Sequence, residues 1–587
     1  MQFLTMVPEP AQQHTHFAAL AVAGVRPASS GESDANISTS AVRLSAIGRE
    51  LWSYAKSHKG WVLCTTIFAL LWTAELFMVQ RFTLVPAQEV GPRLAAWGPF
   101  IRFCLDLLFA ATMTLLLPRI LLVVACIASL TIHLGLLTYF AYFQRPISAL
   151  TIFNNWWEGA QLSGFAGHLF PRQSLLILFG ILALKLVVLY AARRQPMPRA
   201  LRLPLAGLFA TGYFVLSCAA VYLDPLSALQ STRGVGRLGY THGYAQVWLA
   251  ELWYLRGNPN LGKSLLPTDR LSPHEANIPI EDHLAIIQAE SLDYNVLGLT
   301  TNGEEVTPFL NRLRARGMFY RVRAVHNCGS ADADFVTING AAGSPHIVAY
   351  NIPGIRFYSP LPEYLERFGY ETSFFHGNTG NFYNRRGPLE SLNFRQLNFL
   401  EELVSQFGLR TSEFGVRDAD VLALSALQLH HQRKARICHF VITLTTHSPY
   451  LFLRPQDQLL FPKPANAFER YLNNMRYLDD CLRKYIQSLD VPTTVMIYAD
   501  HPAEPEISSP TFQPARSRRP SFREYIPVFI FDTSQDLMSL QKTRHQAISH
   551  DGTLNLIDMT TYLRKQVARA KGVSSAGPST DEAQEQR

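Results

Sequence analysis

Five long apolar runs occupy the first half of this chain of 587 residues, at about 60–79, 97–117, 119–143, 174–192 and 203–223. Each run has close to the ~20 residues that a helix needs to cross the hydrocarbon core of a bilayer. Charged residues make up only 17% of the chain, which also favours a membrane protein over a soluble one. The runs therefore predict a five-helix transmembrane domain over residues 60–223, embedded in the membrane.

The positions of the basic residues predict the orientation of these helices. Clusters of arginine and lysine precede the first run and separate the fourth from the fifth: Arg43, Arg49, Lys56, Lys59, Arg193, Arg194, Arg199 and Arg202. Both clusters lie on one side if all five runs cross, and the positive charge identifies that side as the cytoplasm. Because five is odd, residues after Leu223 are expected outside the cytoplasm of a plasma (inner) membrane. This clustering accounts for the net charge of +8, so no nucleic-acid partner is expected.

Charged residues also lie inside the apolar runs. Arg102 and Asp106 are four residues apart on one face of the second run, which predicts a mutually neutralising pair near the outer surface. Contact with a lipid headgroup is the alternative. Lys185 in the fourth run leaves the same two alternatives open.

The rest of the chain divides by composition. Residues 1–59 are predicted to be a cytoplasmic, mostly disordered tail, and residues 224–281 a linker. The linker contains a short helix at about 247–256 whose Trp and Tyr residues suit the outer membrane interface. Residues 282–570 are predicted to form a globular domain outside the cytoplasm, followed by a disordered tail at 571–587.

Strands and helices alternate along residues 282–570. Strands are expected at 284–289, 371–375, 437–444, 493–498 and 526–531, and helices after Thr307 and near 360–368, 464–487 and 554–567. Such alternation predicts an α/β domain with a mainly parallel sheet. In sheets of this kind, ligands bind beyond the carboxyl ends of the strands.

Polar side chains follow four of the expected strands at that edge. They are Glu290, His376, His447, Asp500 and His501. Two carboxylates and an imidazole, as in Glu290, Asp500 and His501, suit a divalent ion such as manganese, zinc or magnesium. The sequence therefore predicts a metal site at this edge of the sheet.

A serine, Ser330, follows Gly329 where a helix is expected to start. A hydroxyl there can face a metal and an incoming phosphate, because a helix N-terminus favours anions. The metal would lower the pKa of the hydroxyl and make Ser330 a nucleophile. The alternative is that Ser330 only caps its helix.

Six short segments, in chain order, resemble the lipoteichoic acid synthase type of phosphoglycerol transferase, in the sulfatase and alkaline phosphatase superfamily. They are Gln-Ala-Glu290-Ser, Gly-Ser330-Ala-Asp-Ala-Asp-Phe, Phe-His376-Gly-Asn, Phe-Tyr383-Asn-Arg385, Thr-His447-Ser-Pro-Tyr and Tyr-Ala-Asp500-His501. The likeness covers about residues 276–540, and five preceding spans also match the family's architecture. It implies a sulfatase/alkaline phosphatase-like α/β fold for residues 282–570.

The resemblance also implies roles for individual residues. It implies one metal, usually Mn²⁺ with Mg²⁺ or Zn²⁺ as alternatives, held by Glu290, Ser330, Asp500 and His501. It implies a headgroup pocket and catalytic groups around the nucleophile Ser330, namely His376, Tyr383, Asn384, Arg385 and His447. The sequence departs from the synthases at Gly329, where they have lysine, at Ser330, where they have threonine, and at Tyr383, where they have tryptophan.

The expected activity is transfer of a phosphoglycerol headgroup from phosphatidylglycerol to a hydroxyl of a cell-envelope polymer, glycan or glycolipid, through a phospho-Ser330 intermediate. The alternative is a phosphoethanolamine transferase, although those enzymes generally use threonine and often several exported disulfides. Only Cys328, Cys438 and Cys481 lie in the exported half. A sulfatase or phosphodiesterase is less expected, because Asp332 stands where the sulfatase signature after Cys328 needs arginine. A non-enzymatic membrane sensor is the last alternative.

Overall fold

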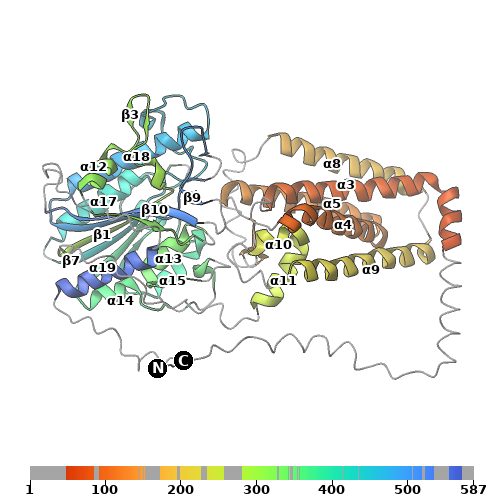
Figure 1. Cartoon of the computed structure of the whole chain (residues 1–587), viewed down its shortest axis with the longest axis horizontal. Coiled ribbons are helices and arrows are strands. Elements are labelled where there is room, and N and C mark those ends of the chain that lie inside the picture. The colour runs from red at the N-terminus through yellow and green to blue at the C-terminus, as the bar shows by residue number, and fades with distance from the viewer. Residues whose placement is uncertain are drawn as a thin grey trace, which may run out of the picture.

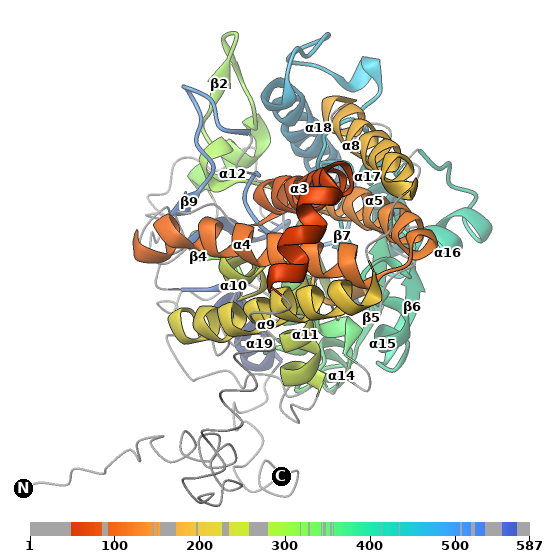
Figure 2. The ribbon, with the colours of Figure 1, turned by 90° about the vertical axis from the view of Figure 1, so that its right-hand side faces the viewer.

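The computed structural model describes residues 48–84, 92–143, 146–149, 151–152, 172–194, 198–225, 234–256, 280–534 and 554–571, with short gaps inside 280–534. Five of its helices are long and apolar enough to cross a membrane, which confirms the predicted spans. They are α3 (Lys59–Thr83), α4 (Pro92–Leu116), α5 (Arg119–Phe143), α8 (Arg172–Ala191) and α9 (Arg199–Leu223). Figures 1 and 2 show them packed side by side, next to a separate α/β domain.

Charged side chains inside the bundle are paired rather than exposed to lipid. Glu75 of α3 accepts hydrogen bonds from Lys185 of α8 and Ser129 of α5, and His133 Nδ1 lies 2.6 Å from its carboxylate. All three charged or titratable groups are nearly fully buried. This is the arrangement that the high cost of a charge in hydrocarbon demands, and it assigns Lys185 to helix packing.

Arg102 and Asp106 are arranged differently from the predicted mutual pair. Arg102 Nη1 donates to the carbonyl of Tyr240 at 3.0 Å, and Asp106 accepts from Gln80 Nε2 at 3.2 Å. The reason is α10 (Gly234–His242), a helix absent from the prediction, which packs against α4 and brings the Tyr240 carbonyl to the guanidinium.

The predicted linker helix is α11 (Tyr244–Arg256), which follows α10 directly. Its buried Glu251 accepts from Ser148 Oγ at 2.5 Å and from the Ala149 amide at 2.7 Å, so the helix is tied to the segment after α5. Its opposite side exposes Trp253, which is 87% accessible. A position in the membrane interface stays a prediction, as do the predicted domain boundaries.

The second domain is built on an eight-stranded mixed sheet. Along the sheet the strands are β4 (Met318–Arg323), β10 (Arg523–Asp532), β8 (Thr493–Ala499), β1 (His283–Ala289), β7 (Arg436–Ile442), β5 (Tyr370–His376) and β6 (Phe394–Asn398), with β9 (Arg516–Ser517) paired to β10. The five strands from β8 to β6 are parallel, and β10 runs antiparallel to both of its long neighbours. The predicted α/β fold with a mainly parallel sheet is confirmed.

Helices cover both faces of this sheet (Figure 1). On one face lie α12 (Pro308–Arg316), α17 (Asp418–His431) and α18 (Ala467–Ser488), and on the other α13 (Ala331–Asn339), α14 (Leu361–Glu366), α15 (Arg386–Glu390) and α19 (Leu556–Ala570). Central strands β1 and β8 are therefore buried along their whole length, which explains their mostly apolar sequence. Because β8, β1, β7 and β5 are parallel neighbours, the residues that follow them meet at one edge.

Candidate active site

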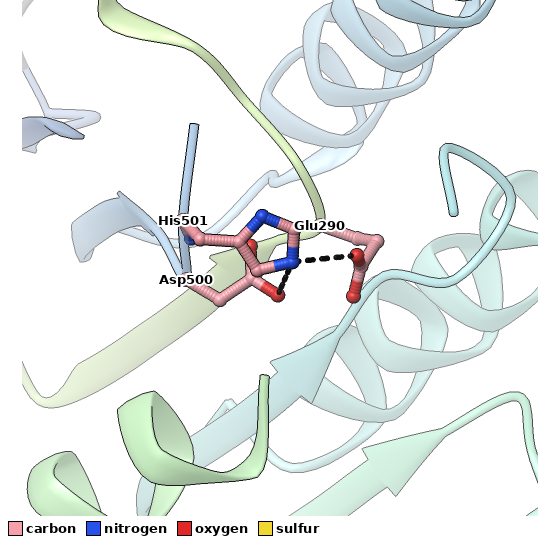
Figure 3. Close-up of side chains that lie close together, drawn as sticks. All are labelled: Glu290, Asp500 and His501. Carbon is pink, nitrogen blue, oxygen red and sulfur yellow. Dashed lines mark hydrogen bonds and ion pairs between the residues drawn. The ribbon is translucent and has the colours of Figure 1, made fainter. Parts of the chain in front are cut away.

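Glu290, Asp500 and His501 converge at the carboxyl edge of the sheet (Figure 3). Glu290 follows β1, and Asp500 and His501 follow β8. His501 Nε2 lies 3.5 Å from Glu290 Oε1 and 3.6 Å from Asp500 Oδ2, and all three side chains are buried. One ligand atom from each lies within 4.8 Å of the others, so the three residues could hold a metal ion.

The neighbouring chain fixes these ligands in place. One oxygen of Asp500, Oδ1, accepts from the amides of Ser291 and His501, each at 2.8 Å. The other, Oδ2, is buried and accepts no hydrogen bond from the part of the chain that the structure describes. Such an unsatisfied buried carboxylate oxygen is costly unless a ligand meets it, and its position 3.6 Å from His501 Nε2 fits a divalent cation.

The orientation of His501 is also set by hydrogen bonding. Its Nδ1 lies 2.8 Å from the carbonyl of Pro502, which leaves Nε2 facing the carboxylates. Burial lowers the pKa of His501, but the carboxylates of Asp500 and Glu290 outweigh burial and raise it to about 10. Burial raises the pKa of the Glu290 carboxyl, but the nearby His447 and His501 outweigh burial and hold this pKa below its usual range. Burial and the Glu290 carboxylate also raise the pKa of Asp500, because the two carboxylates are buried close together.

Ser330 lies beside this cluster and does not act as a side-chain cap. It stands at the N-cap position of α13, yet its hydroxyl makes no capping hydrogen bond within the described part of the chain. Its Oγ lies 3.3 Å from His501 Nε2, and its side chain is almost buried. The hydroxyl is thus directed at the cluster, as a nucleophile or metal ligand would be.

The predicted pocket residues lie around the same edge, but they differ in burial and in hydrogen-bond partners. His376 ends β5 and is buried; burial and the nearby Arg385 lower its pKa to about 3. His447 is close enough to Glu290 to affect the pKa of that carboxyl. Asn384 is exposed and its amide donates to the Tyr350 carbonyl at 2.9 Å. The structure thus brings the two histidines to the site, while Asn384 is already engaged with the backbone.

Arg385 is held in a buried ion pair. Its Nε donates to Asp334 Oδ2 at 2.6 Å, and both side chains are almost inaccessible. Burial raises the pKa of Asp334 to about 6 despite the guanidinium. Because Asp334 sits on the first turn of α13, this pair connects the segment carrying Ser330 to the segment carrying Tyr383 and Arg385.

Gly329 and Tyr383, two of the positions at which the sequence departs from the synthases, touch each other. A Cβ added to Gly329 would lie 2.5 Å from the Tyr383 hydroxyl, and the glycine has a φ of +152°. Tyr383 itself has a left-handed φ of +56° and is buried. The tyrosine ring therefore occupies the space that any side chain at position 329 would need, directly before Ser330.

We expect Gly329→Ala to lower turnover strongly because its Cβ would displace Tyr383 or the backbone before Ser330. Adding Tyr383→Ala should restore part of what the glycine substitution costs, so the effects of the two substitutions should not add. Gly387→Ala is the control, since its Cβ would meet only ordinary contacts. Turnover of the single and double variants checks this. Additive losses would contradict the coupling.

The sequence prediction assigned no role to several side chains that support the site. Thr443 Oγ1 accepts from the Glu290 amide at 2.9 Å, and Thr446 Oγ1 donates to the Glu290 carbonyl at 2.6 Å. His326 lies face to face with His501 and is hydrogen-bonded to Glu524. The threonines follow β7 and could have been found from their place at the strand end. Nothing local in the sequence points to Glu524.

Comparison with known proteins identifies this domain. Residues 283–556 match the family described as Sulfatase, a range that contains every site residue named above. Residues 283–556 are a sulfatase-family domain. The chain is also similar to the lipoteichoic acid synthase of Staphylococcus saprophyticus, 30% identical over 235 residues, which are 37% of this chain and 35% of that protein. The chain thus matches about a third of the length of this relative.

Two solved structures are similar to larger parts of the chain. A lipoteichoic acid synthase from Listeria monocytogenes is 20% identical with a TM-score of 0.41, covering 50% of this chain and 72% of that one. The integral membrane lipooligosaccharide phosphoethanolamine transferase A from Neisseria meningitidis is 15% identical with a TM-score of 0.49, covering 80% and 88%. Independently of these structures, the five apolar helices support a membrane location, and the sulfatase domain follows them in the chain.

Proposed function

We propose that this protein is a membrane-bound, metal-dependent transferase that moves a phosphoglycerol headgroup from phosphatidylglycerol to a hydroxyl of a cell-envelope polymer or glycan. The observation that carries the proposal is the Ser330 hydroxyl, which lies 3.3 Å from His501 Nε2 and does not cap its own helix. Similarity of the chain to relatives named lipoteichoic acid synthase supports the choice of reaction.

The cation would be held by Glu290, Asp500, His501 and the Ser330 hydroxyl. Mn²⁺ is our first choice, with Mg²⁺ or Zn²⁺ as alternatives, because two carboxylates and one imidazole suit these ions. When bound, the cation would lower the pKa of the serine hydroxyl and neutralise negative charge on the phosphate.

The chain's own groups would carry out two displacements at phosphorus. In the first, Ser330 Oγ bonds to the phosphorus of the lipid diester, the bond from phosphorus to the diacylglycerol oxygen breaks, and the serine proton ends on diacylglycerol. In the second, an acceptor hydroxyl bonds to the same phosphorus, the bond to Oγ breaks, and the acceptor's proton returns to Ser330.

The surrounding residues would assist these steps in different ways. His447, beside Glu290, would pass the proton to the departing diacylglycerol. His376 would stay uncharged at physiological pH, since its pKa is about 3, and would orient the substrate by hydrogen bonding. Arg385 would stabilise the phosphate charge, and Tyr383 and Asn384 would contact the glycerol hydroxyls.

The choice of donor rests on the carboxylates near Ser330. Phosphatidylethanolamine carries an ammonium, which calls for a carboxylate that is not already committed. Two carboxylates on the first turn of α13, Asp332 and Asp334, could meet it. Asp334 is committed to Arg385, with both groups buried, and Asp332 is also buried. A neutral diol headgroup needs only hydrogen-bonding partners, so the arrangement favours phosphatidylglycerol over the phosphoethanolamine alternative.

Donor preference is tested by incubating the purified full-length protein with phosphatidylglycerol or phosphatidylethanolamine labelled in the acyl chains. We expect labelled diacylglycerol from phosphatidylglycerol only, because Asp334 is occupied by Arg385. Release from phosphatidylethanolamine alone would replace this proposal by the phosphoethanolamine transferase alternative. Heat-treated protein gives the background.

The donor lipid is reachable only if the sulfatase domain is outside the cytoplasm. We expect a reporter that is active only outside the cytoplasm to be active when fused after Leu223, because five spans follow a basic cytoplasmic segment. The same reporter fused between α8 and α9, after Arg194, should be silent. The opposite pattern would place the domain in the cytoplasm and remove the basis for a lipid donor in the outer leaflet.

A further inference from the structure

His326 packs against the proposed metal ligand His501, although it belongs to none of the segments used above. It lies in the loop between β4 and α13, shortly before Ser330. Its ring is stacked on the His501 ring, with 4.3 Å between centroids and 15° between planes. One face of the His501 imidazole is therefore covered by a second imidazole.

Glu524 holds His326 in this position. His326 Nδ1 lies 2.6 Å from Glu524 Oε2, and Glu524 is itself buried on β10. The backbone supports the same arrangement, since the Ala324 amide donates to the Glu524 carbonyl at 2.9 Å. The pairing of β10 with β4 thus fixes both partners before any ligand binds.

An imidazole ligand must be held in the plane that points its lone pair at the ion. The Pro502 carbonyl restrains one edge of the His501 ring, at Nδ1. This hydrogen bond resists rotation of the ring about its bond to Cβ, and the stacked His326 ring adds a second restraint on the face of the imidazole. Groups that orient a metal ligand in this way typically change metal affinity by ~10- to 100-fold when removed.

We propose that His326 and Glu524 are a positioning pair that fixes the ring plane of His501 and thereby sets the affinity of the site for its divalent cation. This inference rests on the metal centre of the proposed function. The proposed role of His326 is a face-to-face contact with His501 and not a bond to the metal. A ring that stacks but cannot bind metal should therefore be able to substitute for His326.

The test measures Mn²⁺ affinity of the metal-stripped full-length protein in detergent by competition with a fluorescent chelator. His326→Ala should raise the dissociation constant by ~10- to 100-fold, and Glu524→Ala should change it in the same direction. His326→Phe keeps a flat ring over His501 and should remain much closer to the wild type. His430→Ala is the matched control, because His430 also pairs with a carboxylate, Asp490, but on the exposed end of α17.

Two further measurements distinguish positioning of His501 by His326 from a general contribution of His326 to stability. The melting temperature of the metal-free protein should be similar in His326→Phe and wild type, and the visible spectrum of Co²⁺-loaded protein should shift in His326→Ala but not in His430→Ala. Wild-type affinity in both alanine variants would overturn the inference, as would a loss in His326→Phe equal to that in His326→Ala. Failure of the wild type to bind Mn²⁺ would instead overturn the metal centre itself.

Discussion

Replacing Ser330 with alanine is expected to eliminate the covalent adduct and to lower turnover at least ~1,000-fold, the scale seen when a nucleophile is removed. The substitution removes the one hydroxyl that lies 3.3 Å from His501 Nε2. Steady-state release of diacylglycerol from phosphatidylglycerol measures the effect.

The fold should survive this change. Losing a capping serine usually costs ~1 kcal/mol, but the Ser330 hydroxyl makes no capping bond in the described chain. The melting temperature should therefore stay near that of the wild type. Ser391→Ala, at the exposed end of α15, is the control for removing a hydroxyl outside the site. Ser330→Ala with undiminished turnover would refute the mechanism.

Removal of the divalent cation is expected to stop the reaction as well. Excess chelator should lower turnover at least ~100-fold, because a bound cation supplies several kcal/mol of charge stabilisation and each ~1.4 kcal/mol is a factor of ten. Mn²⁺ should restore activity best. The structural reason is that Glu290 and Asp500 are buried close together beside His501.

Asp500→Asn tests the same point without a chelator. It keeps the shape of the side chain but removes the charge of the carboxylate whose Oδ2 is unsatisfied in the described chain. Both metal affinity and turnover should fall together. Asp480→Asn, on the partly exposed side of α18, is the matched control. Full activity in excess chelator, with no ion retained by the protein, would contradict a metal-dependent reaction.

Much of the fold could be predicted because burial leaves a clear pattern in the sequence. Each membrane span is a run of about 20 apolar residues, and the helices α3, α5 and α9 begin and end within a few residues of those runs. Strands β1 and β8 are buried on both faces, so they too read as mostly apolar runs. Once those strands are placed, Glu290 and Asp500 fall at their ends.

Other elements escaped prediction for physical reasons. Strand β6 (Phe394–Asn398) lies at the edge of the sheet and is largely exposed, so it lacks an apolar run. Helix α10 contains three glycines in nine residues, which is atypical of a helix, and it is held by contacts with α4. Helix α17 is different, since its buried residues recur every three or four positions and the sequence does carry its signal.

The contacts between distant residues could not be predicted at all. His326 and Glu524 are 198 positions apart, and Arg385 and Asp334 are 51 apart. Each pair depends on strand order and register, which no local periodicity encodes. The same is true of Gly329 and Tyr383, which the sequence presents as two unrelated departures and the structure places in contact.

The central claim is that Ser330 carries the phosphorylated headgroup between donor and acceptor. The most direct test is mass spectrometry of the Ser330 peptide after the full-length protein has been incubated with headgroup-labelled phosphatidylglycerol and no acceptor. We predict a mass increase equal to one phosphoglycerol group on Ser330, absent from the Ser330→Ala protein. An unmodified Ser330 peptide from protein that is releasing diacylglycerol, or a modification carried by another residue, would contradict the account.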